Sequence, residues 1–433
     1  MKLKFLVIIP YIIFTVILLY TVKNPNRLEL DSYVYERIAE NFLENNILKD
    51  PQTEVMPTIS VGYPLFLGLI YKIFGHNFLS VVFIQAFLGL LIIFLIFKIA
   101  QILFDTQIAL TAAFLSSINL GLITYTQFLL TEILLVSILL SFFYFFLKYL
   151  NSKNIIDLFF ASTFIGISLI IKPVAIFYIS IPLTIFLFQK SLLQKVFIFF
   201  VPIILICSTL VFYNYKTYNS IVLTLAGHEN IFRYFLPRVI SADKKINLEQ
   251  AQKIVDSNIA TSSNKKYSEL YSLLLEYILK KPFLCIKIWI FNVLKTCFGL
   301  HYTAFKVLLN NNIKGGSCAF FNMEGNYLNK AVNYIFYGCE TKFLAIFALC
   351  EILLVFLQYL GLLFLFCAFY LQKKFLNIFL IASYIVYFAL ITGHDGFGRY
   401  RILFEPLLII CAAYLLCFAF NRLRQRKMYE RFA

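Results

Sequence analysis

Residues 60–75 read Ser-Val-Gly-Tyr-Pro-Leu-Phe-Leu-Gly-Leu-Ile-Tyr-Lys-Ile-Phe-Gly, and this segment decides how the rest of the chain is interpreted. It is apolar, but it is shorter than the roughly 20 residues that a helix needs to cross a bilayer. A polar loop that contains Asp31 precedes it, and a longer apolar run begins at residue 78. This order of span, acidic loop, short apolar helix and span predicts that Asp31 lies just outside the membrane.

The composition indicates an integral membrane protein. Hydrophobic residues make up 61% of the 433 residues and charged residues only 14%. A soluble domain could not hide that much apolar surface. The net charge of +16 would suggest nucleic-acid binding in a soluble protein, but here the basic residues lie mostly in loops between apolar runs. We therefore expect them to orient the protein in the membrane and to contact phosphate, and we expect no nucleic-acid partner.

Ten apolar runs are candidate membrane spans. They lie at residues 5–22, 78–98, 108–124, 127–147, 155–171, 174–188, 196–213, 343–371, 375–392 and 402–420. Lys2 and Lys4 precede the first run, and no small-x-small cleavage site follows it, so we expect an uncleaved first span.

Short loops rich in Lys and Arg stay cytoplasmic, and they set the orientation. Three short connections are basic, through Lys148 and Lys153, Lys190 and Lys195, and Lys373 and Lys374. The tail is also basic, through Arg422, Arg424, Arg426 and Lys427. With the N-terminus inside, an even number of spans places all of these residues inside.

Two long segments, residues 23–77 and 214–342, then face the outer side. The second contains Phe283 to Leu309, which is either an eleventh span or an amphipathic surface helix. Lys287 and Lys295 interrupt it and favour the surface helix. We expect an all-α, polytopic transmembrane helix bundle with an extracytoplasmic cap of short helices. Its parts would be an N-terminal module (1–213), a cap (214–342) and C-terminal hairpins with a basic tail (343–433).

The acidic loop predicts an amphipathic helix, because Val34, Ile38 and Phe42 repeat every four residues. Asp31 stands at its start, where it either only caps the helix or acts as a general base close to the membrane. A sugar on a lipid phosphate would favour the second role. Phosphate departs as a stable anion, so one carboxylate that deprotonates the acceptor is enough, whereas glycoside hydrolases need two.

Seven further residues are candidates for substrate binding: Tyr63, Glu132, Lys172, His228, Arg399, Tyr400 and Arg401. Each also has a plainer interpretation, such as a helix start beside Pro64, a packing anchor, a snorkelling lysine or a hydrogen-bonding loop histidine. Arg399 and Arg401 lie in a predicted outer loop, against the usual bias of basic residues, which favours a specific anionic partner. His and carboxylate residues show no metal-ligand spacing, so we expect neither a metal nor another cofactor.

These segments, taken over residues 1–420, resemble the C-type (GT-C) polytopic glycosyltransferase superfamily. Similar members are the protein O-mannosyltransferases, the bacterial aminoarabinose transferases and the Rhizobium-type lipopolysaccharide sugar transferases. The matching patches are Asp31 in the first outer loop, Gly62-Tyr63-Pro64, Thr131-Glu132, Lys172-Pro173, Gly227-His228, and Arg399-Tyr400 with Pro406. Many members have a second carboxylate beside the first, and this chain has Ser32 there.

The resemblance implies an enzyme of a bacterial inner (plasma) membrane whose active site faces the periplasm or exterior. It would move a sugar with inversion from a polyprenyl-phosphate donor to lipid A or lipopolysaccharide, a glycan or a protein. Asp31 would be the general base and the seven residues above would bind substrate. An O-antigen ligase or polymerase, or a lipid-linked glycan transporter or flippase, is the alternative. Polar residues clustered at the outer face favour the transferase, and clustering at the midplane favours the transporter.

Cys318 and Cys339 lie in the long outer loop. In an oxidising compartment such a pair is a candidate disulfide, although spacing alone does not supply the geometry. Most other cysteines fall in apolar runs and are expected to behave as small apolar residues.

Overall fold

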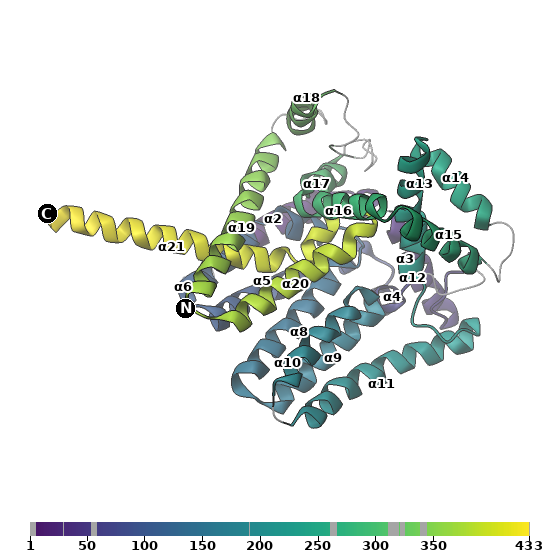
Figure 1. Cartoon of the computed structure of the whole chain (residues 1–433), viewed down its shortest axis with the longest axis horizontal. Helices are drawn as coiled ribbons and strands as arrows, with labels where there is room; N and C mark the ends of the chain where they lie inside the picture. Colours follow the sequence, from purple (N-terminus) through teal and green to yellow (C-terminus); the bar gives the residue numbers. More distant parts are fainter. Residues whose placement is uncertain are drawn as a thin grey trace.

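A computed structural model describes residues 6–432 except 29, 53–58, 190, 260–265, 311–319, 321–324 and 338–343. Across these residues the chain forms helices and no strand (Figure 1). Cys318 and Cys339 lie outside the described residues, so the predicted disulfide stays a prediction.

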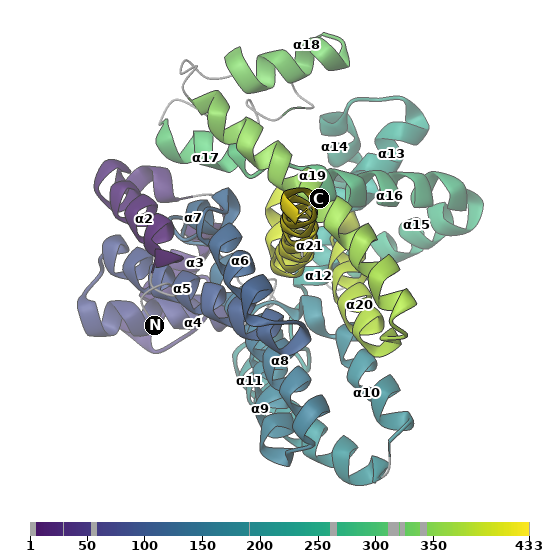
Figure 2. The same ribbon diagram turned by 90° about the vertical axis from the view of Figure 1, so that its left-hand side faces the viewer.

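Six helices are long and apolar enough to cross a membrane within the described part of the chain. They are α5 (Phe78–Leu103), α8 (Glu132–Ser152), α11 (Leu192–Tyr218), α19 (Ala345–Leu371), α20 (Phe375–Ile391) and α21 (Glu405–Phe432). Figure 2 looks along α21, which lies near the centre of the molecule with α6, α19 and α20 around it. The predicted all-α membrane bundle is confirmed, and the chain is a multi-pass membrane protein.

The other four predicted spans correspond to shorter helices. They are α2 (Ile9–Thr21), the pair α6 (Thr106–Ser117) and α7 (Leu120–Tyr125), α9 (Ile155–Ile171), and α10 (Ser180–Leu187) after two short 3₁₀ turns (Pro173–Ala175 and Phe177–Ile179). The run 108–124 is broken because the Asn119 side chain accepts a hydrogen bond from the Leu122 amide at 2.8 Å and starts a new helix. A count of ten spans is compatible with these helices, but length alone does not establish it.

The first outer loop forms two short helices, as the sequence predicts. A 3₁₀ turn (Asn24–Arg27) leads into α3 (Leu30–Asn45), and α4 (Gly62–Phe74) follows. Gly62 is required where α4 meets the end of α9, because a Cβ atom there would lie 2.6 Å from the Ile170 carbonyl oxygen. The Gly-Tyr-Pro segment therefore fixes α4 against the end of α9, beside Lys172.

Within the predicted cap region, the helices between Ala226 and Ile259 and the helix Lys266–Lys280 pack together, and from here on we call these helices the cap. It contains α12 (Ala226–Asn230), a π-helix (Ile231–Phe235), α13 (Leu236–Lys244), α14 (Leu248–Ile259) and α15 (Lys266–Lys280). The cap has a small apolar core of its own, which includes Phe232, Leu236, Val239, Val255 and Leu270. It lies at the far side of the molecule from the C-terminus (Figure 1).

Two helices connect the cap to the C-terminal spans. α16 (Pro282–Phe298) and α17 (Tyr302–Leu309) bend by 63° at their junction. α16 contacts the two 3₁₀ segments that follow α20, Thr392–His394 and Gly398–Leu403, and Trp289 donates to the Leu390 carbonyl at 3.0 Å. Phe283 and Ile286 on α16 are 86% and 54% exposed. Taken as one bent span, α16 and α17 are long and apolar enough to be a seventh crossing, so the surface helix expected from the sequence stays a prediction. α18 (Tyr327–Val332) and a second π-helix (Asn333–Tyr337) follow.

The bundle has two chemically different ends. Lys148 and Lys153 lie at the end of α8, Lys195 at the start of α11, and Lys373 and Lys374 between α19 and α20; we call this the basic end. The start of α8, the end of α9, the end of α20 and the start of α21 meet at the opposite end, together with α3. We call this the site end, because the candidate functional residues gather there.

Candidate active site

Asp31 and Arg399 meet at the site end, although 368 positions separate them in the chain. An Nη2 hydrogen of Arg399 is donated to Asp31 Oδ2 at 2.9 Å. The Asp31 side chain is 40% exposed and that of Arg399 22%, so the pair is open to solvent. Burial alone would raise the pKa of Asp31, but the cations Arg399 and Lys172 outweigh it and lower that pKa below its ordinary value. Asp31 is therefore a carboxylate at neutral pH.

Three more predicted residues surround this pair. Glu132 Oε1 lies 3.7 Å from Arg399 Nε, and Arg399 donates to the Tyr400 hydroxyl at 3.1 Å. Lys172 Nζ lies over the Tyr400 ring, 4.4 Å from its centroid. The structure thus brings together Asp31, Glu132, Lys172, Arg399 and Tyr400 from four separate parts of the sequence.

Buried polar contacts hold Asp31 in place. The Ser32 hydroxyl donates to the Leu129 carbonyl at 2.9 Å, which fixes the start of α3 against the segment that leads into α8. Arg27 is fully buried before α3, where it donates to Gln127 Oε1 at 2.9 Å and to the Val22 carbonyl at the end of α2 at 3.1 Å. Ser32, which stands where many GT-C members have a second carboxylate, therefore has a structural contact here.

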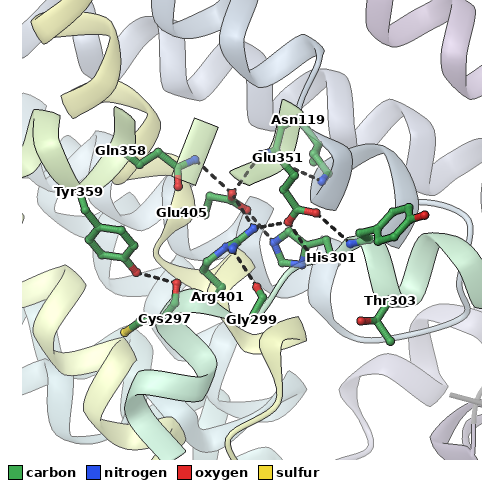
Figure 3. Close-up of polar contacts among 12 residues, drawn as sticks. Asn119, Cys297, Gly299, His301, Thr303, Glu351, Gln358, Tyr359, Arg401 and Glu405 are labelled. Carbon is green, nitrogen blue, oxygen red and sulfur yellow. Dashed lines mark hydrogen bonds and ion pairs between the residues drawn. The ribbon is translucent and has the colours of Figure 1, made fainter. Parts of the chain in front are cut away.

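Arg401 anchors the segment that carries Arg399, the 3₁₀ helix Gly398–Leu403, to buried residues of other helices. Figure 3 shows Arg401 with these partners. Arg401 is fully buried and donates to Glu351 Oε1 of α19 at 2.6 Å and to the Gly299 carbonyl at 2.8 Å. Gly299 and Gly398 approach so closely that a Cβ on Gly299 would lie 2.7 Å from the Gly398 Cα. The sequence predicts that Arg401 binds substrate beside Arg399, but its guanidinium is fully buried and is hydrogen-bonded to Gly299 and Glu351.

The same network extends to the bend between α16 and α17. His301 Nε2 lies 2.9 Å from Glu405 Oε2, and Glu405 Oε1 accepts from Asn119 and Gln358, each at 3.1 Å. The backbone amide of His301 donates to Glu351 at 2.7 Å. Five elements are therefore tied together at one point, α7, α17, α19, α21 and the Arg399 segment, and Figure 3 shows these side chains converging.

Arg238 and Asp395 add a second pair that sequence reasoning did not assign as a pair. Arg238, on α13 of the cap, donates to the His394 carbonyl at 3.3 Å, and its Nη2 lies 3.8 Å from Asp395 Oδ1. Asp395 is 1% exposed, and within the described part of the chain neither carboxylate oxygen has a hydrogen-bond partner. Burial raises its pKa to about 6, although Arg399, Arg238 and Lys172 act in the opposite direction. No local sequence pattern marks Arg238 as a site residue, because His394, which it contacts, lies 156 positions away in the chain.

Two predicted residues lie elsewhere. Tyr63 is fully buried, where its hydroxyl donates to Gln85 Oε1 at 2.8 Å and its ring meets the edge of Tyr35 at 5.2 Å. Tyr63 therefore packs against Tyr35 in the interior, and its side chain does not line the site. His228 lies in α12 of the cap, where its ring contacts the edge of Tyr271 at 5.4 Å. Among the described residues no group of three or more His, Cys, Asp and Glu side chains is placed to hold a metal ion.

The arrangement combines the ionised carboxylate of Asp31 with two cationic side chains that act on it, Arg399 and Lys172. A third cation, Arg238, lies against Asp395. Glu132 and Asp395 balance part of this positive charge. Such a site can accept a proton at Asp31 and attract an anionic group to the cations.

One protein family and several solved structures are similar to this chain. Residues 60–213 match the family described as dolichyl-phosphate-mannose-protein mannosyltransferase. The apo oligosaccharyltransferase of Archaeoglobus fulgidus is similar in structure, with a TM-score of 0.54 at 16% identity over 99% of this chain and 52% of that one. Its complex with an inhibitory peptide and a dolichol-phosphate gives a TM-score of 0.51 at 16% identity, over the same 99% and 52%.

A third similar structure is ArnT from Cupriavidus metallidurans in the apo state, with a TM-score of 0.41 at 11% identity over 94% of this chain and 76% of that one. No curated protein is significantly similar in sequence. This chain spans about half the length of the oligosaccharyltransferase. The likeness to the oligosaccharyltransferase extends over nearly the whole chain, and it shows that this chain shares the fold of that protein, in keeping with the resemblance seen in the sequence.

Proposed function

We propose that the protein is a membrane glycosyltransferase that moves a sugar from a polyprenyl-phosphate donor to an acceptor, with Asp31 as the general base. The observation that carries the proposal is the contact between Asp31 and Arg399, which joins a proton acceptor to an anion-binding group in one solvent-open site. The matching family description names dolichyl-phosphate mannose, and one similar structure holds a dolichol-phosphate. Both support a sugar on a lipid phosphate as the donor.

The ion pair itself has a role in this mechanism. The donor phosphate would take over part of the Arg399 guanidinium, with Lys172 as a second positive charge close by. Asp31 would then lose its strongest partner and become more basic when the donor is in place. A base with a low pKa in the resting site would thus be activated by substrate binding.

The chemical step is a single displacement. The acceptor oxygen forms a bond to the anomeric carbon of the sugar, on the side opposite the phosphate, so the configuration inverts. The bond between that carbon and the phosphate oxygen breaks, and its electron pair leaves with the polyprenyl phosphate. The acceptor proton passes to Asp31. Arg399 and Lys172 stabilise the charge that develops on the leaving phosphate.

The distribution of basic residues between the two ends of the bundle supports a reaction on the periplasmic or exterior side of the membrane. The basic end fits the cytoplasm, because short basic connections are retained there. The site end would then face the periplasm or exterior of an inner (plasma) membrane. The Asp31–Arg399 pair lies at this end of the bundle, and this position favours a transferase over a transporter.

The proposal is tested by incubating the purified protein with labelled polyprenyl-phosphate sugars and measuring release of the sugar from the lipid. Asp31→Asn is compared with Glu40→Gln, which makes the same chemical change on a 47% exposed residue of the same helix. We expect Asp31→Asn to lose about 10²–10⁴-fold in rate, the usual contribution of a general base, and Glu40→Gln to match the wild type. Full activity of Asp31→Asn would exclude Asp31 as the base.

A further inference from the structure

The cap contains a groove that is separate from the Asp31 cluster. It has a volume of about 530 Å³, within the range of small-molecule sites. Its lining comes from the π-helix with the end of α12, from α14 and from the start of α15: Glu229, Phe232, Arg233, Tyr234, Gln252, Asp256 and Leu270. These residues are different from those of the candidate active site described above.

The π-helix Ile231–Phe235 builds one wall of this groove. Such segments are rare and frequently occur at functional sites, because the extra residue shifts side chains out of the α-helical phase. Here Phe232 and Phe235 are buried in the cap core at 2% and 4% exposure. The Arg233 side chain between them is 66% exposed. One short segment therefore packs the cap and presents polar groups to the groove.

Tyr234 connects the groove to the candidate active site. Its ring contacts the edge of Phe397 at 6.0 Å, two residues before Arg399. Burial, and then the nearby carboxylates of Asp395 and Asp31, raise the pKa of the Tyr234 hydroxyl. A ligand held in the groove would therefore extend toward Asp31.

The chemistry of the lining selects the ligand. Arg233 Nε donates to Glu229 Oε2 at 2.8 Å, and Gln252 Nε2 donates to Asp256 Oδ1 at 3.1 Å, so each wall offers a donor next to an acceptor. A hydroxyl group both donates and accepts, and it can use both members of such a pair. The two carboxylates outnumber the one guanidinium and disfavour a polyanion. Each carboxylate already accepts a hydrogen bond from a side chain of the groove, Arg233 or Gln252, which disfavours an ion pair with a basic peptide. The polar residues that α14 contributes to the lining, Gln252 and Asp256, disfavour an acyl chain.

We propose that this groove binds a neutral carbohydrate and holds the glycan part of the acceptor for the reaction at Asp31. The inference rests on the proposed function for its purpose, but the groove's ligand class can be measured without any catalysis.

The test is saturation-transfer NMR on the full-length protein in detergent, with neutral disaccharides (maltose, lactose and N,N′-diacetylchitobiose) as probes. Gln252→Ala and Asp256→Ala remove groove contacts on α14. Lys253→Ala is the matched control on the same helix, because Lys253 is 75% exposed and does not line the groove. We expect at least one disaccharide to bind the wild type and the control equally. Each groove variant should weaken binding about tenfold, the cost of one hydrogen bond.

Trp289, the single tryptophan, reports independently from the same region, since its ring lies 5.1 Å from that of Phe235. A saturable change in its fluorescence with the same disaccharide, lost in the two groove variants, would support the groove as the binding site. Failure of all three disaccharides to bind, or binding that Gln252→Ala and Asp256→Ala leave unchanged, would overturn the inference. Binding of a basic tripeptide in their place would overturn it too. Neither result depends on Asp31, so loss of the proposed enzymatic function would be seen separately in the sugar-release assay.

Discussion

Arg399 is the residue around which the candidate active site is organised. It contacts Asp31 and the Tyr400 hydroxyl through Nη2, and its Nε lies 3.7 Å from Glu132. A guanidinium carries five N–H donors in a fixed plane, so it can keep one partner while it binds a phosphate. A lysine would offer a single charged point and could not hold these groups in fixed relative positions.

Asp395 provides a prediction about pH. Its pKa is raised from 3.8 to about 6 in the folded protein, chiefly by burial, so the fold disfavours the charged carboxylate. The folded state therefore holds this proton more tightly than the unfolded state, and its stability falls as pH rises from about 4 to about 6. Asp395→Asn removes the charge. We expect the variant to be more stable than the wild type above pH 6, by about 3 kcal/mol at most.

Thermal unfolding in detergent between pH 5 and pH 8 measures this difference. Glu249→Gln is the control, because that side chain is 80% exposed and should leave the pH profile of the wild type unchanged. An Asp395→Asn variant less stable than the wild type at pH 7.5 would mean that the charge pair with Arg238 outweighs the cost of burying the carboxylate.

At the scale of elements, the buried network around Arg401 positions the Arg399 segment. Glu351→Gln would remove the carboxylate charge that lies 2.6 Å from Arg401, and it would set an amide NH₂ group against the His301 and Tyr302 amides that now donate to Glu351. Glu405, at 3.3 Å, would remain as a carboxylate partner of Arg401. Breaking a buried ion pair typically costs about 3–5 kcal/mol. We expect a loss of stability of that size, together with a lower rate of sugar transfer, because Arg399 lies two residues from the disturbed side chain.

The matched control is Glu276→Gln on α15, which breaks an exposed pair with Lys280 at 2.7 Å. Exposed pairs contribute about 0–1 kcal/mol, so this variant should unfold and react like the wild type. Equal effects of the two substitutions would show that the network does not hold the Arg399 segment.

Sequence reasoning located the elements better than it located their partners. The helix at 62–74 and the long spans follow from apolar runs, and the outer-end positions of Glu132, Lys172 and Arg399 follow from where those runs stop. The break at Asn119 was missed, because a polar cap inside an apolar run looks like a tolerated interruption. The role of Arg401 was also missed. Its partner Glu351 and the nearby His301 are distant in sequence, so only the folded chain shows that its charge is already balanced.

At the scale of the whole molecule, the two ends of the bundle should lie on opposite sides of the membrane. We expect a cysteine at Arg233, in the cap, to react with a membrane-impermeant maleimide in sealed right-side-out vesicles. A cysteine at Lys374, exposed between α19 and α20, should react only after the vesicles are opened. Both are made in a chain whose nine native cysteines are replaced. Labelling of Lys374→Cys from outside would reverse the proposed orientation.

The fold was predictable at this scale because apolar length and basic loops constrain a membrane bundle strongly. The cap was foreseen only as a set of short helices. The contact of Arg238 with the Asp395 loop joins residues 156 positions apart, which local patterns do not encode. The groove depends on how the π-helix, α14 and α15 pack against one another, which the apolar pattern of each helix alone does not fix.

The measurement that tests the central claim most directly is a double-mutant cycle on kcat/KM for sugar transfer, with Asp31→Asn, Arg399→Gln and the two combined. If the carboxylate and the guanidinium act as one unit on donor and acceptor, the double variant should be no slower than the slower single variant. If instead the two losses multiply, the residues act independently, and the 2.9 Å contact between them has no part in the reaction.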